Sequence, residues 1–86
     1  MQIVFHKNFE KKYLKLSQPL KLKVKKAIVL FEQDHYNIVL KNHALSGKYT
    51  GYRSINVAGD VRIIYKLLYN NAVLFSEIGS HSALYK

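Results

Sequence analysis

Residues 52–78, YRSINVAGDVRIIYKLLYNNAVLFSEI, decide the fold class of this chain. β-Branched and aromatic residues dominate three runs, which predict strands at Tyr52–Val57, Val61–Tyr69 and Ala72–Ile78. Asn70-Asn71 suits a tight two-residue hairpin turn, because asparagine tolerates positive φ, and Ala58-Gly59-Asp60 suits the turn before it. The stretch is therefore expected to form three consecutive antiparallel strands.

Two amphipathic helices are expected upstream of these strands. The first follows Asn8, its expected N-cap, and ends at Ser17. The second is expected from about Pro19 to Asp34, because proline suits the first turn of a helix. The apolar stripes at helical spacing are Phe9, Tyr13 and Leu16 in the first helix, and Leu20, Val24, Ala27, Ile28 and Phe31 in the second.

The remaining segments complete the element order. Gln2–Phe5 reads as a short strand, expected at an edge of the sheet, and Ser80–Lys86 has room for one helical turn. The order is therefore β-α-α-β-β-β. Helices grouped ahead of strands predict an α+β fold, an antiparallel sheet with an αα-hairpin packed on one face. We expect residues 1–86 to form one domain, since the chain shows no linker and no repeat.

Net charge is the most distinctive feature of the composition. Fourteen lysine and arginine residues stand against five aspartate and glutamate residues, which gives +9. A field of this sign attracts RNA, DNA or an acidic protein, and charge alone does not choose among them. Eight lysines are expected on the outer face of the helical hairpin: Lys7, Lys11, Lys12, Lys15, Lys21, Lys23, Lys25 and Lys26. This face is expected to contact ribosomal RNA or, in the alternative, only solvent.

The sequence also disfavours several classes of protein. It has no cysteine, which excludes disulfides and thiolate metal sites and favours the cytoplasm. We expect no signal peptide, and no segment is apolar for long enough to cross a membrane. The four histidines form no i, i+4 pair, and no phosphate-binding glycine loop is present. We therefore expect no metal site and no cofactor.

Strand pairing brings several polar residues to one rim of the sheet. Because neighbouring strands are antiparallel, the end of the last strand returns beside the start of the middle one. His81 should therefore lie near Asp60 and Arg62, and Asn56 ends its own strand at the same rim. Tyr85 is a further candidate for this group.

Alternation along Val61–Tyr69 separates two faces of the middle strand. We expect Ile63, Tyr65 and Leu67 to face the helices. Arg62 then projects from the opposite, open face, where it is available to a ligand.

These residue types suit cleavage of RNA. The 2′-hydroxyl of RNA can attack the neighbouring phosphate if a base, an acid and positive charge are supplied. Histidine suits the proton transfers, and the guanidinium of Arg62 suits the phosphate. Structural roles stay open as alternatives: Asp60 could be a turn residue, Arg62 could pair with Glu77, and Tyr85 could be a packed aromatic tail. His43 could bond backbone in its loop, and His6 and His35 are expected to be structural or solvent-facing.

Two segments together resemble the YafQ branch of the RelE/ParE toxin superfamily. They are LKNHALSGKYTGYRSINVAGDVRIIYK at residues 40–66 and LFSEIGSHSALY at residues 74–85, with the patterns H-x-L-x-G-x-x-x-G-Y-R and G-S/T-H-S/A-x-L. The order β-α-α-β-β-β also matches this superfamily. The resemblance implies the toxin of a toxin–antitoxin pair, which enters the ribosomal A site and cuts mRNA. It implies an antitoxin as partner, and operator DNA contacts through that antitoxin only.

The resemblance also implies roles for single residues. His43, Asp60 and His81 fall where the YafQ branch carries catalytic residues, and Tyr85 falls where it carries an aromatic. Arg62 matches a phosphate-binding arginine of the wider RelE group.

Asn56 and Val61 depart from the branch, which carries histidine and tryptophan there. Because asparagine cannot transfer a proton, the acid–base chemistry would depend on His43, Asp60 and His81.

The leading hypothesis is a metal-independent endoribonuclease acting on ribosome-bound mRNA. His81 is expected as general acid, Asp60 or His43 as base, Arg62 at the phosphate, and Tyr85 as a group that orients or stacks on substrate. Substrate is expected to be held also by Lys48, Arg53 and Asn56, although Arg53 shares a face with Ile55 and Val57 and could be structural. Two alternatives stay open: a non-nucleolytic toxin such as a gyrase inhibitor, and an inactive toxin that acts as an antitoxin-binding co-repressor.

Overall fold

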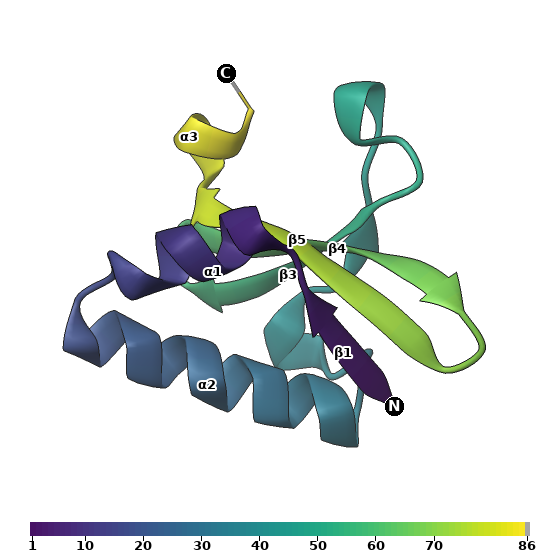
Figure 1. The fold of residues 1–86 in the computed structure, drawn as a ribbon, viewed down its shortest axis with the longest axis horizontal. Helices are drawn as coiled ribbons and strands as arrows, with labels where there is room; N and C mark the ends of the chain where they lie inside the picture. The colour runs from purple at the N-terminus through teal and green to yellow at the C-terminus, as the bar shows by residue number, and fades with distance from the viewer. Residues whose placement is uncertain (86) are drawn as a thin grey trace.

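The computed structural model describes residues 1–85 and shows a twisted sheet with two helices on one side (Figure 1). The elements in chain order are β1 (Gln2–Phe5), α1 (Lys7–Leu14), α2 (Gln18–Gln33), the 3₁₀ turn η1 (Ile38–Leu40), β2 (His43–Ala44), the 3₁₀ turn η2 (Gly47–Tyr49), β3 (Arg53–Ala58), β4 (Val61–Tyr69), β5 (Ala72–Ser80) and α3 (His81–Leu84). The α+β fold class is confirmed. Within the described residues, no helix has the length and apolar character needed to span a membrane.

The sheet has five strands in the order β1-β5-β4-β3-β2. β2, β3, β4 and β5 pair antiparallel, whereas β1 pairs with β5 in parallel, from Gln2 opposite Ala72 to Phe5 opposite Phe75. The edge position expected for β1 is confirmed, and the expectation of a wholly antiparallel sheet is corrected at this strand. β1 and β5 are joined by the helices and the other strands rather than by a hairpin turn, so no turn imposes an antiparallel direction.

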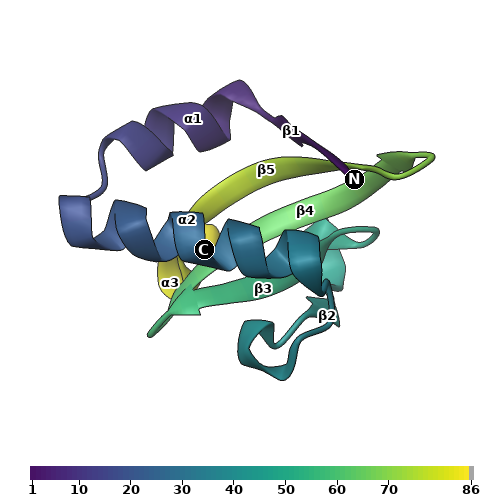
Figure 2. The same cartoon turned by 90° about the horizontal axis from the view of Figure 1, so that it is seen from below.

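The main core lies between the two long helices and one face of the sheet (Figure 2). Phe9 from α1 and Val24, Ala27 and Phe31 from α2 are buried there, as the apolar stripes predicted. On the sheet side they meet buried residues of β3, β4 and β5, namely Ile55, Ile63, Tyr65, Val73, Phe75 and Ile78. Phe31 packs edge-on to both Tyr65 and Phe75, with ring centroids 5.0 and 5.4 Å away.

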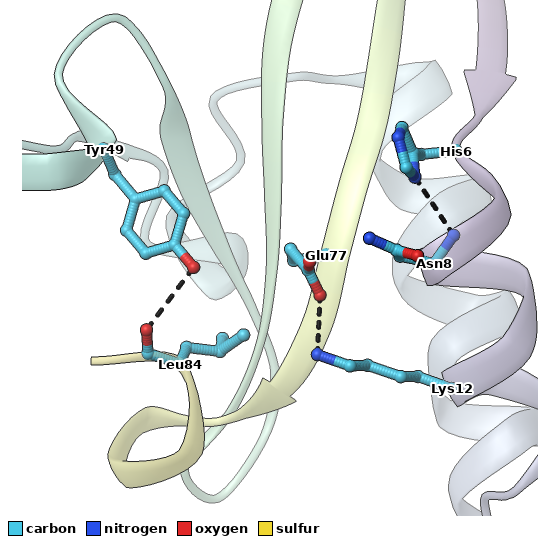
Figure 3. Close-up of polar contacts among 6 residues, drawn as sticks. All are labelled: His6, Asn8, Lys12, Tyr49, Glu77 and Leu84. Atoms are coloured by element: carbon cyan, nitrogen blue, oxygen red, sulfur yellow. Dashed lines mark hydrogen bonds and ion pairs between the residues drawn. The ribbon is translucent and has the colours of Figure 1, made fainter. Parts of the chain in front are cut away.

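The start of α1 differs from the prediction. His6, not Asn8, is the N-cap, and its Nδ1 accepts the backbone N–H of Asn8 at 3.0 Å (Figure 3). An imidazole nitrogen without a proton is an acceptor, so histidine can do here what asparagine more often does. α2 begins at Gln18, next to the predicted start at about Pro19; Ser17 is its N-cap and Pro19 lies in its first turn.

The hairpin of β4 and β5 projects beyond the helices (Figure 1). Ile63 and Tyr65 face the main core as predicted, but Leu67 is 70% exposed, so its expected contact with the helices is wrong. The helices do not extend as far as the part of β4 that carries Leu67, so no helix packs on this side chain.

The opposite face of the sheet carries a smaller buried group. Ile64 is fully buried, although it lies on the face away from the main core. Leu84 of α3 is also buried, and its side chain would lie 3.5 Å from a Cβ added at Gly79. α3 therefore folds back over the end of β5.

Candidate nucleic-acid site at the rim of the sheet

The rim residues converge as the strand pairing predicted. Asn56 of β3 lies opposite Arg62 of β4, and Arg62 lies opposite Gly79 of β5. The backbone N–H of His81 donates to the carbonyl oxygen of Asp60 at 3.0 Å, which ties the start of α3 to the turn between β3 and β4. One end of three adjacent strands thus gathers an amide, a carboxylate, a guanidinium and an imidazole.

Arg62 is oriented by acceptors that surround one nitrogen of its guanidinium. Nη1 donates to Oδ1 of Asn56 and to the carbonyl oxygen of Gly59, the latter at 2.9 Å, with the Val61 carbonyl at 3.4 Å. Gly59 has φ of +54°, a left-handed conformation that favours glycine and turns its carbonyl toward the arginine. These acceptors are neutral, so the positive charge of Arg62 is oriented without being cancelled.

The alternative ion pair between Arg62 and Glu77 is wrong. Glu77 lies opposite Ile64 rather than Arg62, and its carboxylate binds Nζ of Lys12 from α1 at 2.7 Å (Figure 3). A bulge in the pairing of β4 and β5 between Ile64 and Tyr65 accompanies this register.

His81 and Tyr85 form a ring pair on the single turn of α3. Ser80 caps this turn by accepting the N–H of Ala83, and the Tyr85 N–H donates to the His81 carbonyl at 3.0 Å. The two ring centroids are 4.6 Å apart, and the rings are tilted by 38°. The His81 side chain is exposed and Tyr85 is half-buried, so Tyr85 is both a packed aromatic and a neighbour of the His81 imidazole.

A tyrosine pair beside α3, formed by Tyr49 and Tyr52, was not predicted from the sequence. The hydroxyl of Tyr49 in η2 donates to the Leu84 carbonyl at 3.4 Å (Figure 3). The Tyr49 ring also meets the Tyr85 ring edge-on, with centroids 5.6 Å apart. Burial, with a smaller contribution from Glu77, raises the pKa of the Tyr49 hydroxyl. Tyr52 lies 6.0 Å from Tyr49. The signal was present in GKYTGY at 47–52, where aromatics and a lysine alternate with glycines.

Lys48 lies beside these tyrosines. Its Nζ is 5.2 Å from the centre of the Tyr49 ring, and Lys66 holds the same distance to the Tyr52 ring. Cations over tyrosine rings are stabilised by the ring quadrupole. The structure therefore brings Lys48 to the side of the face that Tyr85 borders.

His43 lies on the same face as the rim residues, a position that the sequence could not establish. It is on β2 directly opposite Ser54, and cross-strand partners share a face, as do Ser54 and Asn56 two residues apart on β3. The Nδ1 of His43 lies 2.8 Å from the carbonyl oxygen of Lys41. Because a carbonyl only accepts, Nδ1 carries the proton, which leaves the lone pair of a neutral imidazole on Nε2. The backbone bond and a role as base are thus compatible.

Arg53 is not brought to this face. It lies opposite Tyr65 in the sheet, on the side of the helices, and its Nε donates to Oδ1 of Asn42 at 2.8 Å. Its guanidinium carbon lies 5.4 Å from the centre of the Tyr36 ring. The structural role left open for Arg53 is the one that the geometry supports.

The two other histidines have structural contacts. His6 caps α1, and His35 stacks on Phe31 at 4.7 Å while its Nδ1 bonds the Phe31 carbonyl. Among residues 1–85, no three histidine or acidic side chains gather in a way that could hold a metal ion.

Comparison with solved structures defines the class of protein. The chain matches a YoeB/ParE toxin from Agrobacterium tumefaciens with a TM-score of 0.79 at 16% identity, covering 94% of this chain and 99% of that one. It matches YafQ from E. coli strain BL21(DE3) with a TM-score of 0.78 at 29% identity, covering 99% and 98%. It matches the E. coli DinJ-YafQ complex with a TM-score of 0.75 at 30% identity, again covering 99% and 98%. The fold is that of the RelE/YoeB-like toxins.

The family follows from the sequence match. The family model described as the bacterial toxin of type II toxin–antitoxin systems, YafQ, matches residues 1–86. The comparison with curated protein sequences found no match. The chain belongs to the YafQ family and is a toxin of a type II toxin–antitoxin system.

Proposed function

We propose that this toxin is a metal-independent, ribosome-dependent endoribonuclease that cuts mRNA by attack of the 2′-hydroxyl. The observation that carries the proposal is the placement of His43, Arg62 and His81 on one face, bordered by Tyr85, in a chain of net charge +9. This face offers groups for proton transfer and a cation for the phosphate.

The reaction needs two proton transfers. A base removes the proton of the 2′-hydroxyl, whose oxygen bonds to phosphorus while the bond from phosphorus to the 5′-oxygen breaks. An acid protonates the departing 5′-oxygen, which leaves a 2′,3′-cyclic phosphate. Nε2 of His43 is a candidate base because Nδ1 already donates to Lys41, and Asp60 is the second candidate. His81 is the proposed acid, since its side chain is exposed at the rim.

Arg62 is proposed to stabilise the negative charge that develops on the phosphate. Asn56 and Gly59 hold Nη1, so the guanidinium is oriented before substrate arrives, and such preorganisation is what makes electrostatic stabilisation effective. Asn56 therefore acts on substrate through Arg62. Lys48 is proposed to bind the mRNA backbone, and Tyr85 to orient or stack on a base.

The proposed partners follow from charge and from the relatives. A cognate antitoxin is proposed because the DinJ-YafQ structures are toxin–antitoxin complexes. Operator DNA is proposed to be contacted through that antitoxin only. The lysine-rich α1 and α2 are proposed to contact 16S rRNA, which fits a cytoplasmic protein that acts on translating ribosomes.

Induced expression followed by primer extension on a reporter mRNA tests the proposal. We expect new mRNA ends within the translated region, and their loss in a His43→Ala, His81→Ala double variant. Arrested growth without new mRNA ends would contradict the proposal and favour a non-nucleolytic toxin. Normal growth together with tight antitoxin binding would favour an inactive co-repressor.

A further inference from the structure

Asn42 directly precedes His43, and its side-chain amide links three separate parts of the fold. Nδ2 donates to the His35 carbonyl at 2.9 Å and to the Tyr65 hydroxyl at 2.7 Å. Oδ1 accepts from Nε of Arg53 at 2.8 Å. An amide offers two N–H donors and one carbonyl oxygen, so both ends of this side chain are engaged.

The strand that carries His43 has little else to hold it. β2 consists of His43 and Ala44 alone, at the edge of the sheet, and pairs with Ser54 and Arg53 of β3. The Leu45 N–H adds one backbone hydrogen bond, to the Tyr52 carbonyl at 2.9 Å. A two-residue edge strand makes few backbone hydrogen bonds and would separate easily from its neighbour. A side-chain tether beside it therefore has a large share in fixing its position.

Alternation of side chains lets this tether act without entering the site. Ala44 lies opposite Arg53 on the helix side, and Asn42, two residues earlier, projects to that side as well. His43 projects from the opposite face. Asn42 thus holds the backbone of β2 from the helix side, while the imidazole projects from the face that also carries Asn56 and Arg62.

The groups that hold Asn42 are themselves rigid. Tyr65 is 2% exposed and packs edge-on to Phe31 at 5.0 Å. Arg53 is fixed in the sheet opposite Tyr65 and lies over Tyr36. The tether therefore connects β2 to the main core rather than to another loop.

We propose that Asn42 is a positioning residue that fixes the His43 imidazole for proton transfer, through its bonds to Arg53 and Tyr65. The inference rests on the proposed function, because it assigns Asn42 to the same reaction. A base must lie within hydrogen-bond reach of its proton, and a displacement of about 1 Å can slow a reaction by about 100-fold.

Cleavage kinetics of the full-length toxin on ribosome-bound mRNA test this role. We expect Asn42→Ala to lower kcat by about 10- to 100-fold while KM stays within about threefold, because binding of the phosphate by Arg62 is untouched. Asn42→Asp should recover part of the loss, since a carboxylate can still accept from Arg53 and from the Tyr65 hydroxyl. Asn70→Ala, which removes an exposed amide in the turn between β4 and β5, is the matched control and should keep wild-type kinetics.

A double-variant comparison separates positioning from general damage. If Asn42 acts through His43, Asn42→Ala should slow the His43→Ala toxin by no more than about twofold. An equal loss in both backgrounds would overturn the inference, because it would mean that Asn42 acts independently of the imidazole. If Asn42→Ala fails to fold, Tyr65→Phe removes a single hydroxyl of the tether and should show the same pattern.

A second readout does not depend on cleavage. In ¹⁵N NMR of the free toxin, neutral His43 should show a single tautomer with the proton on Nδ1, and Asn42→Ala should mix the two tautomers. A wild type that cuts no RNA would remove the proposed function, and this spectrum would still decide whether Asn42 positions His43. Unchanged kcat and an unchanged His43 tautomer in both Asn42→Ala and Tyr65→Phe would overturn the inference.

Discussion

Replacing Arg62 tests whether the rim works through oriented positive charge. Arg62→Ala removes a guanidinium that Asn56 and Gly59 hold in place. Arg62→Lys keeps the charge but replaces a planar fork with a flexible ammonium, which cannot keep the same bonds and also face a phosphate with two donors.

The expected magnitudes differ for activity and stability. Removing one preorganised donor from a developing oxyanion costs about 100- to 1,000-fold in kcat, or about 3–4 kcal/mol. The stability loss should be only about 1 kcal/mol, because Arg62 is half-buried and water can replace it at its acceptors. For a domain of this size such a loss lowers Tm by about 4–8 °C, which leaves the toxin folded at assay temperature.

Single-turnover cleavage of a ribosome-bound reporter mRNA, read by primer extension, measures the loss. Thermal unfolding followed by circular dichroism gives the Tm of the same samples. We expect Arg62→Ala to lose at least about 100-fold in rate and Arg62→Lys to lie between it and the wild type.

An Arg62→Ala toxin that is folded and cuts within about threefold of wild type would contradict a role for Arg62 at the phosphate. An equal loss of rate in Arg62→Ala and Arg62→Lys would show that the planar guanidinium, and not charge alone, is required. A wild-type rate in Arg62→Lys would show instead that charge alone is enough.

Three further predictions concern residues around the site. Ser54 is 1% exposed and its Oγ finds no hydrogen-bond partner among the described residues, so Ser54→Ala should leave the free energy of unfolding in urea unchanged or raise it by up to about 1 kcal/mol. Burial raises the pKa of Tyr65, which favours the protonated native state: stability from this group is full below about pH 10 and lost as pH rises through the native pKa. Between about pH 9 and 11, a range that spans the ordinary phenol pKa, the free energy of unfolding in urea should therefore fall less steeply for Tyr65→Phe than for the wild type. Gly59→Ala should lower stability by about 1–2 kcal/mol and slow cleavage, because alanine is strained at φ of +54° and the carbonyl that holds Arg62 would move; an unchanged Tm would contradict this.

The sequence predicted the parts of the fold that depend on repeating patterns. The stripe of α2 and the three strands β3, β4 and β5 each extend over several residues, so their hydrophobic period could be recognised. β2 has two residues and therefore no period, which is why it was not expected. The direction of β1 could not be predicted either, because it pairs with a strand about 70 residues later in the chain.

The same distinction holds for the candidate site. Asn56, Arg62 and His81 could be grouped in advance because consecutive antiparallel strands fix which ends meet. His43 could not be placed, because its strand is held by side-chain bonds rather than by a run of apolar residues. Tyr49 was missed for a related reason: it reaches α3 through the path of a loop, which no periodic pattern encodes.

Asn56 stands where the YafQ branch carries a histidine, yet it keeps Arg62 oriented. The resemblance implies a histidine at this position, and a protonated imidazole could not accept from Arg62 and would repel it. An aspartate would accept, but it would also neutralise the guanidinium. Asn56 accepts without charge, so Arg62 stays oriented and fully cationic. The chain thus has one proton-transfer group fewer than the resemblance implies, and the proposed chemistry depends correspondingly more on how firmly His43 and His81 are held.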